Sequence, residues 1–357
     1  MAQQHLDPPT SSLAGTAPRA PAPLDEGGAP IGDALAGYLR AQATEFLRSL
    51  RQHRETGAAA SGAGESGDAA RSLRRSARRI SGSLHTFRPL LDADWSEGMR
   101  PELAWLSGTL AREHAYAARL ERLLGALNRL SGPAAVPVQA GRTPAAAPKT
   151  GNLTIGAAKA GALLDRQLTL ARTRAHSAAL QALGSSRFHA VADSVAVLAS
   201  EVPLAPAADT ADLRPLAAAA QDRLTDAVSA LPLVVAGHPY NAEALVHGLS
   251  ADTAPQPQDA PWHQVRLLLR LHRYAHEVLY QGECPVDLRR LGAGKALNRH
   301  RDAAEAASAA ASAARTPRIA PATAYALGVL HADQRHEVEA ARFAFQQAWQ
   351  KEAVRTP

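Results

Sequence analysis

Apolar residues recur every three or four positions along most of this chain, which is the period of an amphipathic helix. In residues 69–88 the apolar positions fall on one side of such a helix and the arginines on the other. The period predicts helices from near Asp33 and over about 68–91, 101–130, 163–183, 185–200, 212–230, 262–280, 300–314 and 321–353. No stretch has the alternating pattern and turn residues of a strand or hairpin. The pattern therefore predicts an all-α fold.

Segments rich in Pro, Ala, Gly and Ser separate these helices. Residues 1–30 are expected to form a disordered tail, and residues 56–67 a flexible loop. The longest such segment, 131–152, is expected to be a linker. It divides a helical domain over 32–353 into a front bundle, about 32–130, and further helices, about 156–353.

Composition agrees with this fold and narrows the setting of the protein. Alanine is abundant and aromatic residues make up only 4% of the chain, which favours helices over strands. The single cysteine, Cys284, excludes an intrachain disulfide and a multi-cysteine metal site. There is no signal-peptide pattern and no apolar run of membrane-spanning length. These features predict a soluble protein of the cytoplasm.

Lys and Arg number 39 against 33 Asp and Glu, giving a net charge of +6, and only four of the basic residues are lysine. A GC-rich genome produces such an arginine bias without any functional selection. The alternative is functional, because a guanidinium is always charged and grips phosphate oxygens with two hydrogen bonds.

The stretch RSLRRSARR at 71–79 sharpens that choice. Four of its arginines and one later histidine fall within an arc about 100° wide on the helix; they are Arg71, Arg74, Arg75, Arg78 and His85. A solvated helix face usually mixes both signs, because like charges four residues apart repel. Here no acid occurs between Asp68 and Asp92. This concentration of positive charge indicates a compensating anion.

The same spacing returns 192 residues later. Arg71, Arg74 and Arg78 correspond to His263, Arg266 and Arg270, and Arg273 extends the second row. The apolar positions keep the same register, with Leu73 matching Val265 and Ala77 matching Leu269. A repeat that preserves both faces favours an internal duplication.

Three stretches resemble the CHAD domain, the conserved histidine α-helical domain. They are ARSLRRSARRISGSLHTFRPLLD (70–92), ELAWLSGTLAREHAYAARLERL (102–123) and WHQVRLLLRLHRYAHEVL (262–279), in the order typical of the family. The resemblance covers about residues 32–350. It implies two helical bundles related by pseudo-two-fold symmetry, with a basic central groove that binds inorganic polyphosphate. Members of the family are linked to polyphosphate granules and are regarded as binders rather than enzymes.

Residues matching the family's basic helices, together with Arg71 from the charged arc, form the predicted site. The predicted polyphosphate-binding residues are Arg71, Arg74, Arg78, Arg79, His263, Arg266, Arg270 and Arg273. Weaker candidates are Arg75, His85, Arg166, Arg172, Arg223 and Tyr274. Arg79 lies at the flank of the arc, and Tyr274 has the alternative of a half-buried packing residue. Glu277 on the basic face is interpreted as a structural salt-bridge partner.

The chain also departs from the family pattern. Arg71 stands in place of the first histidine, Ser81 in place of a later arginine, and His85 where a basic residue is common. The family's Arg-Asp-x-Asp motif appears as residues 114–117, His-Ala-Tyr-Ala, and a late Asp position holds His336. Leu271 and His272 replace a basic–apolar pair. A divergent member that has lost ligand binding is therefore one alternative.

Signs of catalysis are missing from the sequence. There is no GxSxG, P-loop or HExxH motif, and no ExExK signature of the triphosphatase domain sometimes fused to CHAD domains. His272 and His276 lack an acid or cysteine at ligand spacing and are interpreted as packing residues rather than metal ligands. We expect a protein that binds polyphosphate without catalysis, cofactor or membrane association. Nucleic acid is the alternative partner, although neither basic helix interleaves the aromatics that stack bases.

Overall fold

The computed structural model describes residues 31–58, 63–131, 152–238, 249, 257–281 and 287–350. The α-helices are α1 (Ile31–Ala58), α2 (Ala63–Thr86), α3 (Ala93–Leu130), α4 (Asn152–Leu183), α5 (Ser186–Ser200), α6 (Arg214–Ser229), α7 (Leu233–Ala236), α9 (Ala260–Leu279), α10 (Leu288–Ala314) and α11 (Pro321–Gln350). Short 3-10 helices are η1 (Arg88–Leu90), η2 (Pro206–Asp209) and η3 (Pro257–Asp259). Within the described residues, β-type pairing is confined to one isolated bridge between Leu91 and Leu204. The predicted all-α fold is confirmed.

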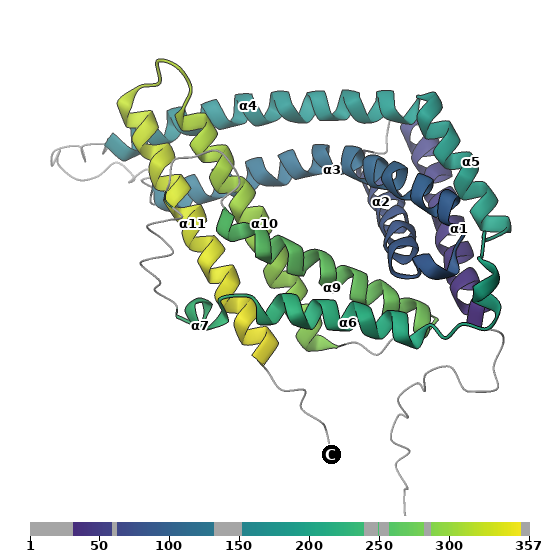
Figure 1. Ribbon diagram of the computed structural model, residues 1–357. Helices are drawn as coiled ribbons and strands as arrows, with labels where there is room; N and C mark the ends of the chain where they lie inside the picture. Colours follow the sequence, from purple (N-terminus) through teal and green to yellow (C-terminus); the bar gives the residue numbers. More distant parts are fainter. Residues whose placement is uncertain are drawn as a thin grey trace, which may run out of the picture.

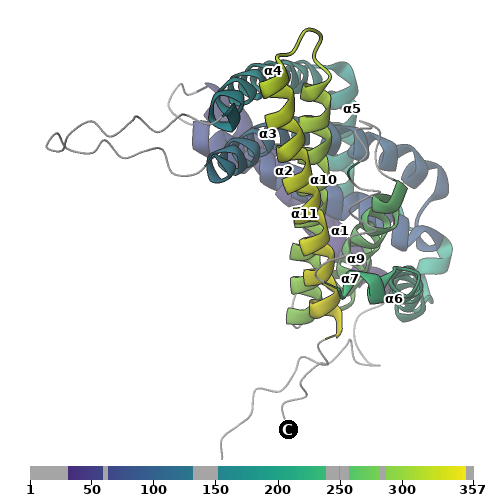
Figure 2. The same ribbon diagram turned by 90° about the vertical axis from the view of Figure 1, so that its left-hand side faces the viewer.

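Figure 1 shows how the helices are arranged relative to one another. Long α4 runs above α3, with α1, α2 and α5 at one end, α10 and α11 at the other, and α6 and α9 below. The turned view in Figure 2 shows α10 and α11 running alongside each other. None of the helices in the described part of the chain is long and apolar enough to cross a membrane.

Three apolar clusters hold the described helices together. The first joins α1, α2, the front half of α3 and α5 to the start of α6 and the end of α9. The second joins the rear of α3 to α4, α10 and α11, and the third joins α6, α7 and α9 to the other halves of α10 and α11. Helices α3, α10 and α11 therefore each contribute to two clusters. Pseudo-two-fold symmetry between two bundles stays a prediction.

The basic helices α2 and α9 pack as their apolar patterns predict. Leu73 and Ala77 of α2 are fully buried, as is Val265 of α9, and Leu269 is 7% exposed. The two helices pack tightly where Gly82 faces Tyr274. A Cβ atom added to Gly82 would lie 2.5 Å from Cδ2 of the tyrosine ring. Only a residue without a side chain allows this approach.

Several predicted boundaries were wrong, and in two helices the cause is a capping residue that starts the helix earlier. α3 begins at Ala93 rather than 101, since the Asp92 side chain accepts a hydrogen bond from the Trp95 amide at 2.8 Å. Pro101 lies inside this helix. α10 begins at Leu288 rather than 300, and the Asp287 carboxylate caps its first turn. α2 ends at Thr86 rather than 91, where the chain continues as η1.

The predicted flexible loop over 56–67 was also wrong at both ends. α1 continues to residue 58 and α2 starts at 63, because the many alanines in this segment favour helix. Likewise α4 begins at 152 rather than 163. The predicted tail 1–30, residues 132–151 of the predicted linker and Cys284 lie outside the described residues.

Candidate anion-binding site

Five arginines from three helices meet where α2, α9 and α10 come together. They are Arg74 and Arg78 of α2, Arg266 and Arg270 of α9, and Arg301 of α10, called here the arginine cluster. Their guanidinium groups lie close enough to repel one another. Among the described residues, no carboxylate forms an ion pair with the four arginines of α2 and α9. Their positive charge is therefore not neutralised within this part of the protein.

The lowered pKa values of these arginines show that the surroundings disfavour their charged forms. Burial, followed by repulsion from neighbouring arginines, lowers the pKa of Arg266 to about 9 and that of Arg78 to about 10. The pKa values of Arg74 and Arg270 are lowered mainly by burial as well. A bound anion would relieve both causes, because it supplies opposite charge and hydrogen-bond acceptors.

Neutral side chains orient part of the cluster. Arg78 donates from Nε to Oγ of Ser107 in α3 at 2.9 Å, and Arg266 donates from Nε to Oδ1 of Asn298 in α10 at 2.9 Å. The Nε atoms of Arg74 and Arg270 are buried without a hydrogen-bond partner in the described structure. The two hydrogen bonds orient the guanidinium groups without neutralising their charge, as expected of a site for an anion.

Arg301 is the cluster member that the sequence pattern missed. The helical period predicts a helix only from about residue 300, and Arg301 is not among the predicted site residues. In the structure it lies within α10 and contacts Asp302 and, at 3.8 Å, Glu305. The basic run NRHR at 298–301 is the signal that could have found it.

His263 lies at the edge of this cluster. Its half-buried ring meets that of His300 edge-on at a centroid distance of 5.4 Å. Burial, with Arg266 and Arg301 nearby, lowers the pKa of His263 despite the opposing charge of Asp259. A neutral imidazole can donate one hydrogen bond to an anion but adds no charge.

Arg79 and Arg273 point to a different partner, the carboxylate of Glu277. Arg79 donates two hydrogen bonds to it, at 2.7 and 3.2 Å, and Arg273 lies 3.3 Å away. Tyr38 of α1 donates a third hydrogen bond at 2.8 Å. Burial would raise the pKa of Glu277, but the hydrogen bond and charge of Arg79, aided by Tyr38 and Arg273, lower it. The predicted structural role of Glu277 is confirmed, and it neutralises part of the predicted site.

Two further predicted site residues, Arg71 and Tyr274, lie outside the arginine cluster. Arg71 is exposed and pairs with Asp68, one turn earlier in α2. Tyr274 is 4% exposed and packs against Gly82, which agrees with the packing alternative. The guanidinium of Arg273 lies 5.1 Å from the centre of its ring.

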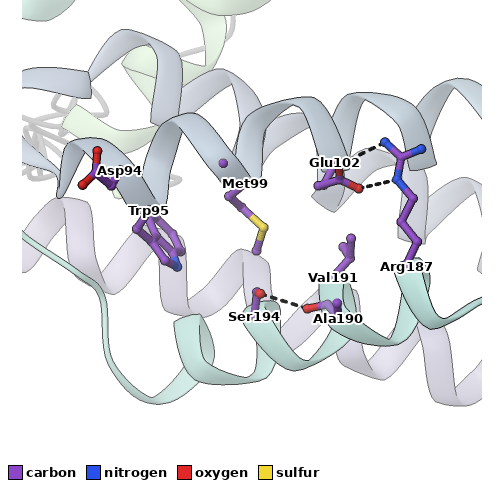
Figure 3. Close-up of a pocket in the computed structure, with 9 residues that line it drawn as sticks. Asp94, Trp95, Met99, Glu102, Arg187, Ala190, Val191 and Ser194 are labelled. Atoms are coloured by element: carbon purple, nitrogen blue, oxygen red, sulfur yellow. Dashed lines mark hydrogen bonds and ion pairs between the residues drawn. The ribbon is translucent and has the colours of Figure 1, made fainter.

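A cavity of about 700 Å³ adjoins the cluster between α1, α2, α9 and α10. We call it the side cavity. Arg266 and Arg270 line it, as do Arg75, Arg79 and Arg273. A smaller cavity, about 330 Å³, lies between α3 and α5 beside the ion pair of Arg187 and Glu102, and no predicted site residue lines it (Figure 3).

His272 and His276 also line the side cavity. Their ring centroids are 4.2 Å apart, and Nε2 of buried His272 lies 3.0 Å from Arg290. Burial and the charge of Arg290 lower the pKa of His272 to about 3. In the described residues no group of three or more His, Cys, Asp or Glu side chains could hold a metal ion.

Comparison with known proteins settles the family. The CHAD domain profile matches residues 41–310. The chain belongs to the CHAD domain family. It is 72% identical to PptA from Streptomyces chartreusis, covering 90% of this chain and all of that one, with a TM-score of 0.75. A CHAD domain from the plant Ricinus communis is 17% identical over 92% of this chain and 97% of its own, with a TM-score of 0.49. A comparison with curated proteins found no match.

The weaker CHAD candidates lie away from the arginine cluster. Arg75 lines the side cavity, and exposed Arg166 lies on α4. Arg172 lies 3.8 Å from Glu113. His85 contacts Arg100 at 3.0 Å, and burial together with Arg100 and exposed Arg223 lowers its pKa. Apart from Arg75, these residues do not contribute to the side cavity or the cluster.

Two of the departures from the CHAD pattern, Leu271 and His272, pack against other parts of the structure. Leu271 packs at the α2–α9 crossing, where it would lie 3.3 Å from a Cβ at Gly82, and His272 is buried. His336 is exposed on α11. His114 of α3 lies near Arg71 and Arg74, and its pKa is lowered chiefly by burial. Arg74, Arg78, Arg266 and Arg270 of the cluster match the basic helices of the family pattern.

Proposed function

We propose that this CHAD protein binds inorganic polyphosphate through the arginine cluster. The observation that carries the proposal is the meeting of Arg74, Arg78, Arg266 and Arg270 from two distant stretches of the chain without a carboxylate partner in the described residues. A chain of phosphates offers closely spaced anionic oxygens that arginines bind with two hydrogen bonds each. Family membership agrees with this ligand.

Nucleic acid fits the same surface less well. Binding of single strands combines basic grooves with aromatic side chains on which the bases stack. The aromatic residue nearest the cluster on α9, Tyr274, is buried against Gly82 and presents no free face. Polyphosphate needs no such platform. The same proposal places the protein in the cytoplasm, at polyphosphate granules.

We infer further that the protein is a binder and not an enzyme. Metal-assisted attack on phosphate esters and anhydrides uses carboxylates that hold the metal ions in place. The described carboxylates nearest the cluster, Asp302 and Glu305, are engaged by Arg301, and Glu305 also by Arg119. The cluster thus supplies charge for binding and no free acid for chemistry.

The test is titration with long-chain polyphosphate at increasing salt. Counterion release predicts that log affinity falls linearly with log salt, with a slope of about −0.7 for each phosphate neutralised on a flexible chain. The double variant Arg74→Ala/Arg266→Ala should weaken binding strongly and flatten this slope. The controls are Lys159→Ala and Arg129→Ala, exposed residues outside the cluster and the side cavity.

Three results would overturn the proposal. They are binding that does not respond to salt, an unchanged affinity in the double variant, and a preference for DNA at equal phosphate concentration. The alternative of a scaffold without a ligand predicts that polyphosphate leaves the melting temperature unchanged, whereas a ligand that binds only the folded state raises it.

A further inference from the structure

The side cavity has the volume of a pocket for a compact ligand. Its volume of about 700 Å³ lies within the range of about 300–1,000 Å³ typical of pockets for compact small molecules. It shares Arg266 and Arg270 with the arginine cluster, so one continuous basic surface leads into it. A chain held by the cluster can therefore extend into the side cavity.

The charges that line the side cavity are not balanced. Its cationic residues are Arg75, Arg79, Arg266, Arg270, Arg273, Arg290 and Lys295, and its acids are Glu45, Glu277 and Asp287. Glu277 pairs with Arg79 and Arg273, and Asp287 lies 3.2 Å from Arg290. Glu45 pairs with Arg48, which does not line the cavity.

Four cations consequently have no carboxylate partner among the described residues: Arg75, Arg266, Arg270 and Lys295. They come from α2, α9 and α10, and so surround the space from three sides. The Nε atom of Arg270 is buried without a hydrogen-bond partner in the described structure. The site therefore has an unused hydrogen-bond donor as well as excess positive charge.

The acids on the cavity wall restrict how a phosphate chain can lie. Glu277 and Asp287 are held in place by their arginine partners, so a chain that crossed the cavity would run against fixed carboxylates. A chain that ends within the cavity avoids them. A terminal phosphate also carries close to two negative charges near pH 7, as a phosphate monoester does, because its last proton has a pKa of about 6.

We propose that the side cavity is a second anion site, which receives a terminal oligophosphate group. The group belongs either to the end of a polyphosphate chain or to a nucleoside triphosphate. The inference deepens the proposed function, on which it rests through Arg266 and Arg270, while Arg75 and Lys295 serve the side cavity alone. These two residues are exposed, so their replacement leaves the packing intact.

The experiment compares three probes, namely long-chain polyphosphate, tripolyphosphate and ATP, in direct titrations. The variants are Arg75→Ala/Lys295→Ala for the side cavity and Arg74→Ala for the arginine cluster. The matched control is Arg129→Ala/Lys159→Ala, which removes the same two residue types elsewhere. The side-cavity variant should lose tripolyphosphate affinity by about tenfold or more, since two charge-assisted contacts disappear.

The same variant should change long-chain affinity by less than about threefold, because the interior contacts of the cluster remain and many phosphates share the binding. Arg74→Ala should show the opposite pattern. Arg75→Lys/Lys295→Arg should restore tripolyphosphate binding. ATP binding as tight as that of tripolyphosphate, and equally sensitive to the side-cavity variant, would identify the nucleotide; weaker ATP binding would identify the chain end.

The two proposals fail in different ways. If long-chain polyphosphate binds but tripolyphosphate and ATP do not, or bind equally to wild type and the side-cavity variant, the second site is refuted and the proposed function stands. If tripolyphosphate binds through Arg75 and Lys295 while long chains do not bind, the second site stands and the proposed function is refuted.

Discussion

Gly82 lies against the ring of Tyr274, and these two positions are 192 residues apart, as are Arg74 and Arg266. This tight contact between α2 and α9 thus joins equivalent positions of the two basic stretches. This relationship brings the two arginine rows together and agrees with the internal duplication inferred from sequence. The absence of a side chain at position 82 is what permits it.

Replacing Gly82 by alanine should therefore separate the helices. The new Cβ would lie 2.5 Å from the tyrosine ring, and such overpacking costs about 1–3 kcal/mol. Urea unfolding should show this loss, and polyphosphate affinity should fall with it. The control is Gly37→Ala in α1. A Cβ added there would meet no other atom within 4 Å, so alanine should stabilise the helix by about 0.5–1 kcal/mol. A Gly82→Ala protein as stable as wild type would contradict the tight crossing.

The hydrophobic period was sufficient to predict much of this arrangement. It identified the buried faces of α2 and α9, because core burial repeats with the helix period and leaves its trace in local sequence. It also placed Arg74, Arg78, Arg266 and Arg270 on the opposite faces. Helix ends were harder to predict, since Asp92 and Asp287 act as caps through single side-chain contacts.

Contacts between distant helices could not be predicted in the same way. Nothing local in the sequence indicates that Arg79 meets Glu277, 198 positions later, or that Arg301 joins the cluster. The side cavity arises where four helices fail to fill the space between them, which is a property of packing. Family resemblance suggested the proposed ligand class, but the division of the arginines into paired and unpaired sets required the structure.

Arg266 should destabilise the ligand-free protein, because its half-buried charge is repelled by Arg270, Arg301 and Arg78. Arg266→Met keeps the length of the side chain without the charge and should raise stability by about 1 kcal/mol near pH 7. The folded-state pKa of about 9 lies well below the usual value for arginine, so wild type gains stability as pH rises above 9 and the difference shrinks. Thermal unfolding at pH 7 should show the variant to be more stable than wild type, and at pH 10 the difference should be smaller. Exposed Arg299→Met is the control. Lower stability of Arg266→Met at pH 7 would refute the repulsion.

Glu277 should limit polyphosphate affinity, since it neutralises Arg79 and Arg273. Glu277→Gln keeps the shape and frees both guanidinium groups for phosphate. We expect tighter binding at low salt. The plot of log affinity against log salt should also become steeper, by the amount expected for up to about two further neutralised phosphates. Glu97→Gln, which removes an exposed carboxylate beside Arg100, is the control. Unchanged or weaker binding by Glu277→Gln would show that neither arginine is within reach of the chain.

Asp259 anchors the start of α9 to α11 within the core. Its buried carboxylate accepts hydrogen bonds from Arg335, at 2.8 and 3.2 Å, and from Arg342, at 2.6 Å. Asp259→Asn would leave buried Arg335 without its ion-pair partner, whereas Arg342 keeps Glu339, and breaking a buried pair costs about 3–5 kcal/mol. Asp212→Asn, at an exposed pair with Arg214, should change stability by less than about 1 kcal/mol. Similar denaturant midpoints for the two variants would disprove this role.

His300 completes the same buried network, with Nε2 3.5 Å from Oδ1 of Asp259. Burial, and then the charge of Arg342, lowers its pKa to about 4 although Asp259 opposes the shift. Between pH 6.5 and 4 the unfolded chain therefore binds more protons than the folded one. Stability should fall as the pH falls through this window, by up to about 1.4 kcal/mol per pH unit from this group.

His300→Gln removes this contribution, so its free energy of unfolding should vary less steeply between pH 6.5 and 4 than that of wild type. The slope is the measured quantity, because the substitution itself changes the stability at every pH. His272 is buried in both proteins and its pKa is also lowered, so part of the slope remains. Exposed His189→Gln should retain the wild-type slope. If His300→Gln and wild type lose stability in parallel on acidification, then protonation of His300 does not oppose folding, and the acid sensitivity belongs to other groups.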